Sequence, residues 1–324
     1  MKDPATHVVA PGEAGLRLDR VVAALPGVGS RRRAREAVVS GKVDVDGVTA
    51  GVEDAGRALP AGARVTLAWD RPGTSNALAR AREGLGGLAI LHEDRSLLAV
   101  DKPAGLLTEA ASRRQSQERD TLVKRLRAYL RVQGDRLHVV HRIDRDTSGV
   151  VLVARTEAAA LRLGAEFRTH RPERVYLAVV HGVLDPPEGD WADWMAWDPG
   201  RLLQVPSAPG RRGAVLAEAS YRTVRAFGGR ASEVEVRLHT GRRNQIRLHL
   251  EIRGHPLLGE MLYLPDGWED PGLYAPRQAL HARRLAVRHP DDGRITAFEA
   301  PVPPDMAALL EGLGRLGRPP HGAG

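Results

Sequence analysis

One stretch of the sequence joins a charged loop to an apolar run with few folding alternatives. Residues 150–154 (Val-Val-Leu-Val-Ala) contain no polar side chain, and β-branched residues suit a pleated surface. A short run of this kind predicts a buried strand. The preceding residues, 141–149, carry arginines, aspartates and hydroxyl groups. A strand holds such a loop rigidly, as a reacting side chain requires, so we expect the chemistry there.

Asp144 is the candidate reactive group of this loop. It follows the apolar Ile143 and stands between Arg142 and Arg145, so burial and cations could both tune its carboxyl group. A plainer interpretation is a structural turn: aspartate, threonine and serine side chains bond their own backbone, and Gly149 permits unusual φ values. The local chemistry alone leaves both interpretations open.

The composition is that of a globular protein with excess positive charge. The 324 residues are 42% hydrophobic and 27% charged, which suffices for a large domain and a small one. A net charge of +8 favours an anionic partner. The alternative is an arginine-rich composition without functional meaning, and the position of the arginines along the chain must decide between the two.

Several classes of protein are excluded or disfavoured. There is no cysteine, which excludes disulfides, thiolate catalysis and cysteine-based zinc sites. No apolar run is long enough to span a bilayer, and the first residues lack the apolar core of a secretory signal. We therefore expect a cytoplasmic protein without a membrane partner.

Residues 14–70 predict a small α/β domain. The pattern predicts two helices, a hairpin and a closing strand: residues 16–25, a helix capped by Ser30, a hairpin at 41–48 that turns at Asp46-Gly47, and residues 64–69. The second helix opens with Arg31, Arg32, Arg33 and Arg35, which suit phosphate binding at a helix N-terminus. A solvated charged face is the alternative.

A larger domain is predicted over residues 88–313. A linker at 71–87 precedes it, and a disordered tail at 314–324 follows. The patterns predict strands near 88–100, 173–182, 217–224, 231–238 and 278–285, and helices near 121–131, 157–167 and 303–313. Residues 191–213 are rich in proline, tryptophan and arginine and show no clear periodicity.

The loop and a second segment resemble a known family. Residues 141–149 (HRIDRDTSG) closely resemble the HRLDRDTSG signature of RluA-family pseudouridine synthases, and residues 240–250 (TGRRNQIRLHL) resemble its TGRxHQIRxHL motif. Asn244 stands where the family usually has histidine, so we expect no acid–base role there. Weaker similarities lie at 93–105, 174–182, 254–263 and 278–290. The N-terminal domain resembles the RNA-binding domain first seen in ribosomal small-subunit protein four.

The resemblance implies an α+β fold with a mixed, mainly antiparallel sheet, and conversion of uridine to pseudouridine in RNA with base flipping. Asp144 would attack C1′ or remove the 2′ proton, and the sequence leaves both open. Arg247 would pair with Asp144 and keep it ionised, and Tyr176 would stack on the uracil and could assist removal of the proton from C5. Arg142 would fill the space of the flipped base, while Arg242 and Gln245 would contact RNA. The family needs no metal or other cofactor, so His249, His255, His281 and His289 are expected to be structural.

Two other functions are compatible with parts of the sequence. A non-catalytic RNA-binding factor would explain the basic domain but not the retention of Asp144, Tyr176 and Arg247. A sugar hydrolase could use Asp144 with Asp146, yet arginines around both carboxylates fit RNA better. Large-subunit ribosomal RNA is the expected target and transfer RNA the alternative, and we expect a monomer. The sequence does not define the modified uridine.

Overall fold

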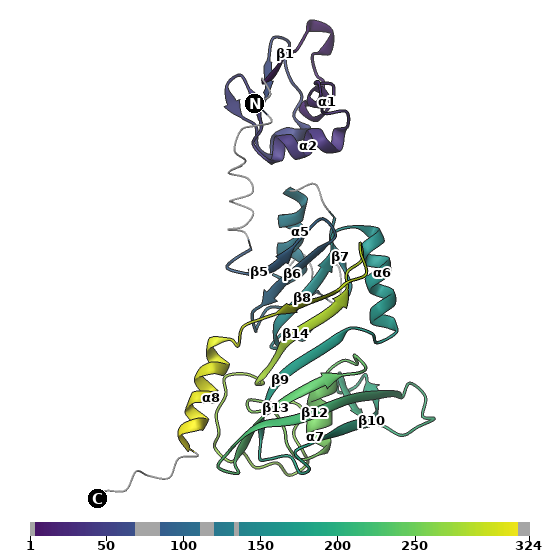
Figure 1. The fold of residues 1–324 in the computed structure, drawn as a ribbon, viewed down its shortest axis with the longest axis vertical. Coiled ribbons are helices and arrows are strands. Elements are labelled where there is room, and N and C mark those ends of the chain that lie inside the picture. The colour runs from purple at the N-terminus through teal and green to yellow at the C-terminus, as the bar shows by residue number, and fades with distance from the viewer. Residues whose placement is uncertain (1–3, 69–84, 111–119, 133–135, 317–324) are drawn as a thin grey trace, which may run out of the picture. The chain divides into compact units, whose positions relative to one another are not determined.

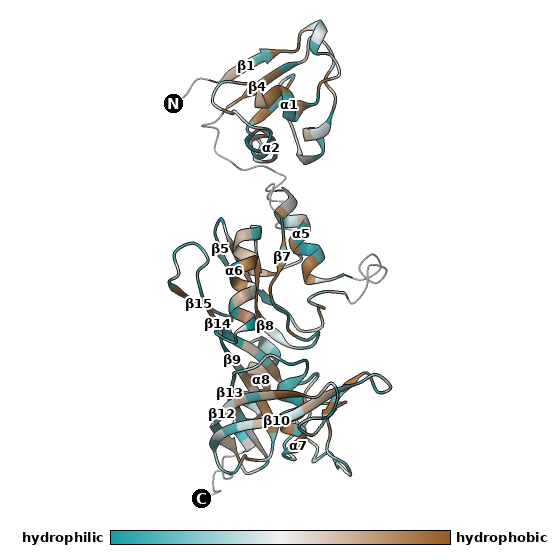
Figure 2. Ribbon diagram, turned by 90° about the vertical axis from the view of Figure 1, so that its right-hand side faces the viewer, coloured by the Kyte–Doolittle hydropathy of each residue, from teal (hydrophilic) through white to brown (hydrophobic). Residues whose placement is uncertain are grey.

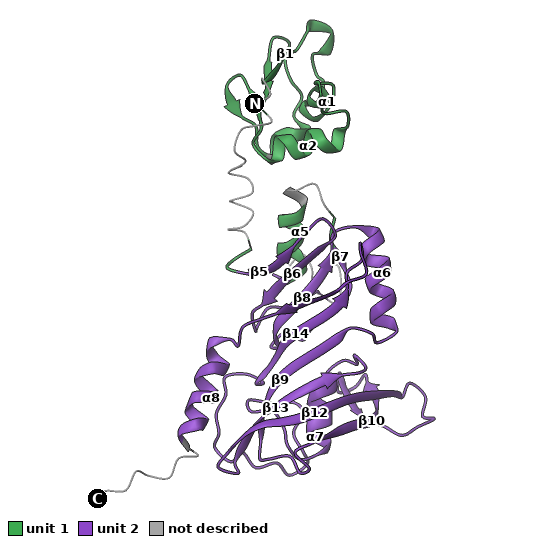
Figure 3. Ribbon diagram, viewed as in Figure 1, with its two compact units in different colours: residues 1–87, 122–137 green, residues 88–121, 138–324 purple. Residues whose placement is uncertain are grey.

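A computed structural model describes residues 4–68, 85–110, 120–132 and 136–316 (Figure 1). The chain divides into two compact units, residues 1–87 with 122–137 and residues 88–121 with 138–324 (Figure 3). The assignment of residues 14–70 and 88–313 to an RNA-binding and a catalytic domain stays our prediction. Most of the predicted linker and the last eight residues of the predicted tail lie outside the described residues.

The N-terminal unit holds a four-stranded sheet in the order β1-β4-β2-β3. Its elements are β1 (Ala5–Val8), α1 (Leu18–Ala23), α2 (Arg31–Val39), β2 (Val43–Val45), β3 (Val48–Thr49), β4 (Arg64–Leu67) and α5 (Leu122–Val132). The Ser30 side chain accepts a hydrogen bond from Arg33 N, and so caps α2 as predicted. Asp46 and Gly47 both have positive φ, which confirms the predicted tight hairpin turn.

The second unit is built on an 11-stranded sheet of described strands. Its main path runs β11-β10-β12-β13-β9-β14-β8-β6-β5, with β7 beside β8 and β15 beside β14. Their bounds are β5 (Ala89–Glu93), β6 (Leu97–Lys102), β7 (His138–Val139), β8 (Ser148–Ala154), β9 (Glu173–His181), β10 (Glu188–Asp198), β11 (Leu203–Pro206), β12 (Val215–Phe227), β13 (Ala231–Leu238), β14 (Leu280–Arg288) and β15 (Ile295–Glu299). The pairing of β14 with β8 is parallel and the other described pairs are antiparallel, which confirms the predicted fold class.

Helices cover both faces of this sheet: α6 (Glu157–Arg168), α7 (Gln245–Ile252) and α8 (Pro304–Leu316). Strand β9 contributes to the core on each face, because its alternate residues point to opposite faces of the sheet. Ala178 and Val180 share a core with α7, while Leu177 and Val179 share one with α8. Figure 2 shows hydrophilic and hydrophobic stretches alternating along α6, as expected for an amphipathic helix.

Two boundaries differ from the predictions. Residues 191–213 are not an irregular insertion, because β10 and β11 form an antiparallel pair there. Trp191 of β10 is buried and stacks on Tyr221 with ring centroids 4.5 Å apart, so it anchors the sheet. At the C-terminus, α8 continues to Leu316, three residues beyond the predicted end. Its apolar side, which includes Leu313, keeps the helix packed to the last turn.

Candidate active site

Asp144 lies in the loop between β7 and β8, and that loop is fixed from several directions. Strand β8 is buried along its whole length, as the apolar run predicts. Three carbonyls of the loop accept side-chain hydrogen bonds from other segments: Ile143 O from Thr108 Oγ1 (2.7 Å), Arg145 O from Lys102 Nζ (2.8 Å) and Asp146 O from Arg277 Nη1 (3.0 Å). The backbone on both sides of Asp144 is thereby held in place.

Lys102 is the most deeply placed of these supports. Its side chain is fully buried, and Nζ also donates to the carbonyls of Pro103 (2.9 Å) and Leu106 (2.8 Å). The three protons of an ammonium group are thus all used. Burial lowers the pKa of Lys102 to about 7, although Asp146 and Asp144 act in the opposite direction. The lysine therefore ties the 103–106 turn to the Asp144 loop.

Gly149 permits the close approach of β8 and β14. Its φ is +114°, and a Cβ built there would lie 2.2 Å from Ala282 O. No residue with a side chain fits at that distance. The glycine therefore allows the one parallel pairing of the described sheet, His281 with Ser148 and Ala282 with Gly149.

The loop forms one wall of a cavity of about 320 Å³. The other walls come from β9, the end of β13, the start of α7 and the first residue of β14. Every predicted catalytic residue lines it, together with the predicted RNA contacts of this unit: Asp144, Tyr176, Arg247, Arg142, Arg242 and Gln245. The cavity therefore unites residues that lie more than a hundred positions apart in the sequence.

Asn244 makes the direct contact with the candidate carboxylate. Its Nδ2 donates to Asp144 Oδ2 at 2.9 Å, and its Oδ1 accepts from the Tyr263 hydroxyl at 3.3 Å. The hydroxyl contact fixes the orientation of the amide. Asn244 precedes α7 with a φ of 54° and makes no capping hydrogen bond with its side chain. Asparagine tolerates this left-handed conformation, so the amide is free to reach Asp144.

The predicted direct pair between Arg247 and Asp144 is wrong. Arg247 instead forms a two-bond ion pair with Glu260, Nε to Oε2 at 2.7 Å and Nη2 to Oε1 at 2.5 Å. Glu260 also accepts from backbone amides of the turn that follows it. The guanidinium is 8% exposed and lies 4.6 Å from the centre of the Tyr263 ring. Its interaction with Asp144 is a longer-range Coulombic one.

Tyr176 stands on β9 with its ring at the cavity. Burial raises the pKa of Tyr176 to about 12, and Asp144 acts in the same direction, while Arg174 opposes them. At neutral pH the hydroxyl therefore keeps its proton. A protonated phenol can stack or donate a hydrogen bond, but it is not a base in the resting site.

The side chain of Gln245 lines the cavity, but its hydrogen bonds are made to other residues of the protein. It is 2% exposed, and its Oε1 accepts from Thr240 Oγ1 (2.8 Å) and Arg242 N (2.9 Å). Its Nε2 donates to Glu218 O at 2.9 Å. These bonds hold the loop between β13 and α7. We therefore replace the predicted RNA contact of Gln245 with a positioning role.

Two of the four arginines predicted to bind RNA in the N-terminal unit, Arg31 and Arg35, lie beside a buried carboxylate. Asp19 is fully buried, and Arg17, Arg31 and Arg35 lie 3.1, 3.2 and 3.4 Å from its Oδ2. Three cations around one anion leave an excess of positive charge, and each arginine remains about half exposed. Of the other two predicted contacts, Arg32 pairs with Glu36 on the surface, and Arg33 is exposed.

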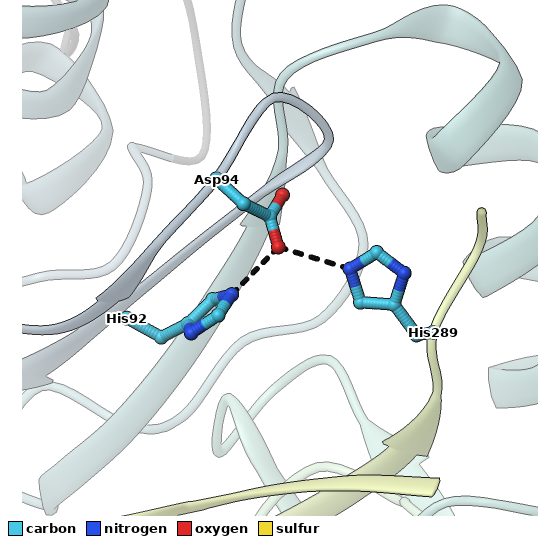
Figure 4. Close-up of side chains that lie close together, drawn as sticks. All are labelled: His92, Asp94 and His289. Atoms are coloured by element: carbon cyan, nitrogen blue, oxygen red, sulfur yellow. Dashed lines mark hydrogen bonds and ion pairs between the residues drawn. The ribbon is translucent and has the colours of Figure 1, made fainter. Parts of the chain in front are cut away.

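The four histidines considered as a metal cluster lie in four separate contacts. Their partners are Asp193 for His249, His181 O for His255, Ser148 for His281 and Asp94 for His289. Within the described residues, His289 instead forms a three-residue group with His92 and Asp94 that has the composition of a metal site (Figure 4).

Proton placement favours hydrogen bonds over a metal in this group. Both histidines approach Asp94 Oδ2 through Nε2, His92 at 2.6 Å and His289 at 2.9 Å. His289 Nδ1 accepts from Asp291 N at 3.2 Å, so in the neutral ring the proton is on Nε2. A metal on Nε2 would require that proton to move to Nδ1, against the Asp291 amide. The group therefore ties the turn after β5 to the end of β14.

Comparison with known proteins gives the family. Residues 96–252 match a family model described as RNA pseudouridylate synthase, and residues 16–55 match that of the S4 domain. An uncharacterized RNA pseudouridine synthase of Synechocystis is 32% identical over 308 residues, which cover 93% of this chain and 90% of that protein. This chain belongs to the RNA pseudouridine synthase family. It is therefore an isomerase of RNA.

Other relatives agree with this family. A protein named ribosomal large subunit pseudouridine synthase D from Nitrosomonas europaea is 33% identical over 95% of this chain and 86% of its own length. Among solved structures, human RNA pseudouridylate synthase domain containing 1 is 26% identical with a TM-score of 0.54, and covers 69% of this chain and 88% of that one. Human RNA pseudouridylate synthase domain containing 4 has a TM-score of 0.58 at 21% identity, which shows the shared fold. No described helix is both long enough and apolar enough to cross a membrane.

Sequence reasoning missed two members of this synthase site. Asn244 was noted as a departure from the family motif but not as a partner of Asp144. Glu260 lies within the weaker similarity at 254–263 and was not singled out from the sequence. One signal was available for Glu260: a buried arginine on an apolar helix face needs a carboxylate, and Glu260 follows α7 after a short loop.

Proposed function

We propose that this synthase converts a uridine of large-subunit ribosomal RNA to pseudouridine, with Asp144 as the reacting carboxylate. The observation that carries the proposal is Asp144 at the wall of a cavity that also holds Tyr176 and Arg247. The target is suggested by relatives named for the ribosomal large subunit. Transfer RNA is the alternative target.

The reaction breaks the N1–C1′ bond, rotates the uracil, and joins C5 to C1′, while the proton on C5 moves to nitrogen. Substrate and product have the same atoms, so no co-reactant is consumed. Asp144 either attacks C1′ or removes the 2′ proton, and the two roles are alternatives within this proposal. The amide of Asn244 orients the carboxylate and leaves its charge intact.

The remaining residues handle the base and the strand. Tyr176 supplies an aromatic face for the uracil, with its hydroxyl protonated. Flipping a base out of a helix costs a few kcal/mol, and Arg142, exposed at the cavity wall, is placed to occupy the vacated space. The excess charge around Asp19 would bind phosphates of the RNA.

The test is to map pseudouridine in ribosomal and transfer RNA from cells with and without the gene. One site should disappear on deletion. The wild-type gene should restore it and a gene with Asp144→Ala should not. Restoration by Asp144→Ala would refute the role of Asp144. An unchanged pseudouridine map would refute the RNA target and favour a binding factor without catalysis.

A further inference from the structure

A second cavity adjoins the active site on the side of α6. Its volume is about 700 Å³, and it shares five lining residues with the active-site cavity: Arg142, Tyr176, Leu238, Gly241 and Arg242. We call it the flanking groove, and define it by Arg142, Phe167, Arg168, Arg174, Leu238 and Arg242. Because the walls are shared, a strand that places one nucleotide beside Asp144 must place a neighbour in or near this groove.

Four arginines line the flanking groove and none has a carboxylate partner. Within the described residues, Arg142, Arg168, Arg174 and Arg242 form no ion pair within 4.0 Å, and no lining residue of the groove is acidic. Elsewhere in the same unit, partly or fully buried arginines are paired: Arg155 with Glu93, Arg247 with Glu260, Arg253 with Asp193 and Arg277 with Asp305. The groove is thus a concentration of cations that the fold leaves to an outside anion.

Arg174 is the most constrained of the four. Its Nη2 donates to the carbonyls of His239 (3.1 Å) and Leu238 (3.4 Å), while its buried Nε has no hydrogen-bond partner among the described residues. Gly241 makes room for it, because a Cβ there would lie 2.3 Å from Nη1. Burial lowers the pKa of Arg174, while Tyr176 acts in the opposite direction. Nη1 of Arg174 forms no hydrogen bond within the described residues and is not a buried atom, so a phosphate oxygen would bind there.

The rest of the groove is suited to a base. Val139, Val140 and Leu238 give an apolar surface, and the rings of His141 and Phe167 stack beside it with centroids 4.9 Å apart and planes 15° apart. His141 Nε2 accepts from Leu152 N at 2.9 Å, which fixes its ring. Burial lowers the pKa of His141 to about 3, so this ring is neutral at physiological pH. Aromatic faces of this kind stack bases without sequence preference.

We infer that the flanking groove binds the unpaired nucleotide next to the target uridine, with its base against Phe167 and its phosphate on Arg174. The inference rests on the proposed function for the identity of the substrate as RNA. The volume lies within the usual range for a ligand site. The groove thereby makes the enzyme sensitive to the state of the neighbouring nucleotide, which must leave its stack together with the uridine.

The phosphate contact is tested with full-length Arg174→Met, Arg174→Lys and Arg225→Met. Arg225 pairs with Glu233 away from both cavities and is the matched control. Binding of an RNA fragment that contains the mapped uridine is measured at several salt concentrations. Arg174→Met should weaken binding about tenfold and reduce the slope of log K against log salt by about 0.7. Arg174→Lys should keep the slope, and Arg225→Met should leave the affinity, the slope and the single-turnover rate within about twofold of wild type.

Equal slopes for Arg174→Met and Arg225→Met would overturn the inference. If the wild type modifies no RNA, the proposed function fails, and the same comparison of slopes with oligouridine still tests the groove. Melting temperatures of the three variants identify a folding defect. If Arg174→Met does not fold, the slope is measured with Arg168→Ala, whose exposed side chain lines the same groove.

The base contact is tested by measuring how wild type and Phe167→Ala bind three RNAs. One RNA is intact, and each of the other two lacks the base on one side of the uridine. Stacking predicts that Phe167→Ala weakens binding of the intact RNA about tenfold. The same change should have little effect when the base on the bound side is absent. Equal weakening for the intact RNA and for both abasic RNAs would contradict the placement of a base in the groove.

Discussion

Asp19 and Asp144 are both aspartates with arginines close by in the sequence, yet the fold treats them differently. Three guanidinium groups lie within 3.4 Å of Asp19. Within the described residues, no lysine or arginine nitrogen lies within 4.0 Å of Asp144, whose Oδ2 accepts from the neutral amide of Asn244. Arg247, which was predicted to pair with Asp144, is paired with Glu260.

The difference separates a structural carboxylate, Asp19, from the carboxylate that we propose reacts, Asp144. Burial acts to raise the pKa of Asp19, but the hydrogen bonds and charges of Arg17 and Arg31 outweigh it and lower the pKa. A carboxylate so bound is a weak base and a poor nucleophile, because its lone pairs are occupied. Asp144 keeps lone pairs available, and the amide of Asn244 orients it without neutralising it.

Asp144→Asn should have the largest effect, because it removes the carboxylate that we propose reacts. The amide can neither attack C1′ nor remove a proton, so the rate of pseudouridine formation should fall by about 10⁴-fold or more. RNA affinity should stay within about twofold of wild type, because no cation depends on Asp144 as a direct partner. Single-turnover assays with the mapped RNA measure the rate. Substantial remaining activity would show that another group reacts.

Asp19→Asn tests the structural role of the buried carboxylate in the N-terminal unit. Three arginines would lose their shared anion, and because each is about half exposed and can be rehydrated, we expect a loss of about 2 kcal/mol in the free energy of unfolding. Denaturant unfolding of the full chain measures it. The exposed pair of Arg32 with Glu36 is the control. Glu36→Gln should lower the free energy of unfolding by less than about 0.5 kcal/mol. The rate for bound RNA should not change in either variant.

Substitutions of Asn244 sharpen the comparison, because this residue takes the place that arginines have at Asp19. Asn244→Leu removes a hydrogen bond to a charged group, which predicts a loss of about tenfold to a hundredfold in the rate for bound RNA. Asn244→His restores the family residue with a ring nitrogen that can donate, and should retain most of the activity. Asn244→Asp places a second carboxylate beside Asp144 and should move the active range to higher pH.

Asp94 is a third carboxylate, paired with two histidines in place of arginines, and gives the smallest expected effect. Burial opposes ionisation, but hydrogen bonds from His92, His289 and two backbone amides hold the pKa of Asp94 well below its usual range. A lowered pKa in the folded state adds stability above about pH 4, which is lost as the pH falls below that value. Wild type should therefore lose stability more steeply than Asp94→Asn between pH 4 and pH 2. Equal slopes would contradict the pairing.

The sequence predicts local structure well where neighbouring residues determine it. The helix after Ser30, the turn at Asp46-Gly47 and the buried strand at 150–154 all depend on short-range rules, and the structure confirms them. The paired strands β10 and β11 escaped prediction because burial in this region does not follow a clean alternation. Their positions depend on β12, which provides the pairing edge.

The candidate site was predictable as a set of residues but not as a set of contacts. Motifs identified Asp144, Tyr176 and Arg247 together, and all three line one cavity. The motifs did not identify the partner of each charge, because the pairing depends on rotamers and on distances of a few ångströms between remote segments. Arg247 with Glu260 and Asn244 with Asp144 are both of this kind.

The chemical reactivity of Lys102 should report on the motion of the Asp144 loop that it supports. Lysine stands at positions 2, 42, 102 and 124 of this chain, and arginine supplies the remaining fixed positive charge. The amine of Lys102 is buried and committed to three carbonyls. An amine-reactive reagent can reach it only when the 103–106 turn and the Asp144 loop separate. The rate of acylation at Lys102, followed by mass spectrometry, therefore measures how often the Asp144 loop opens.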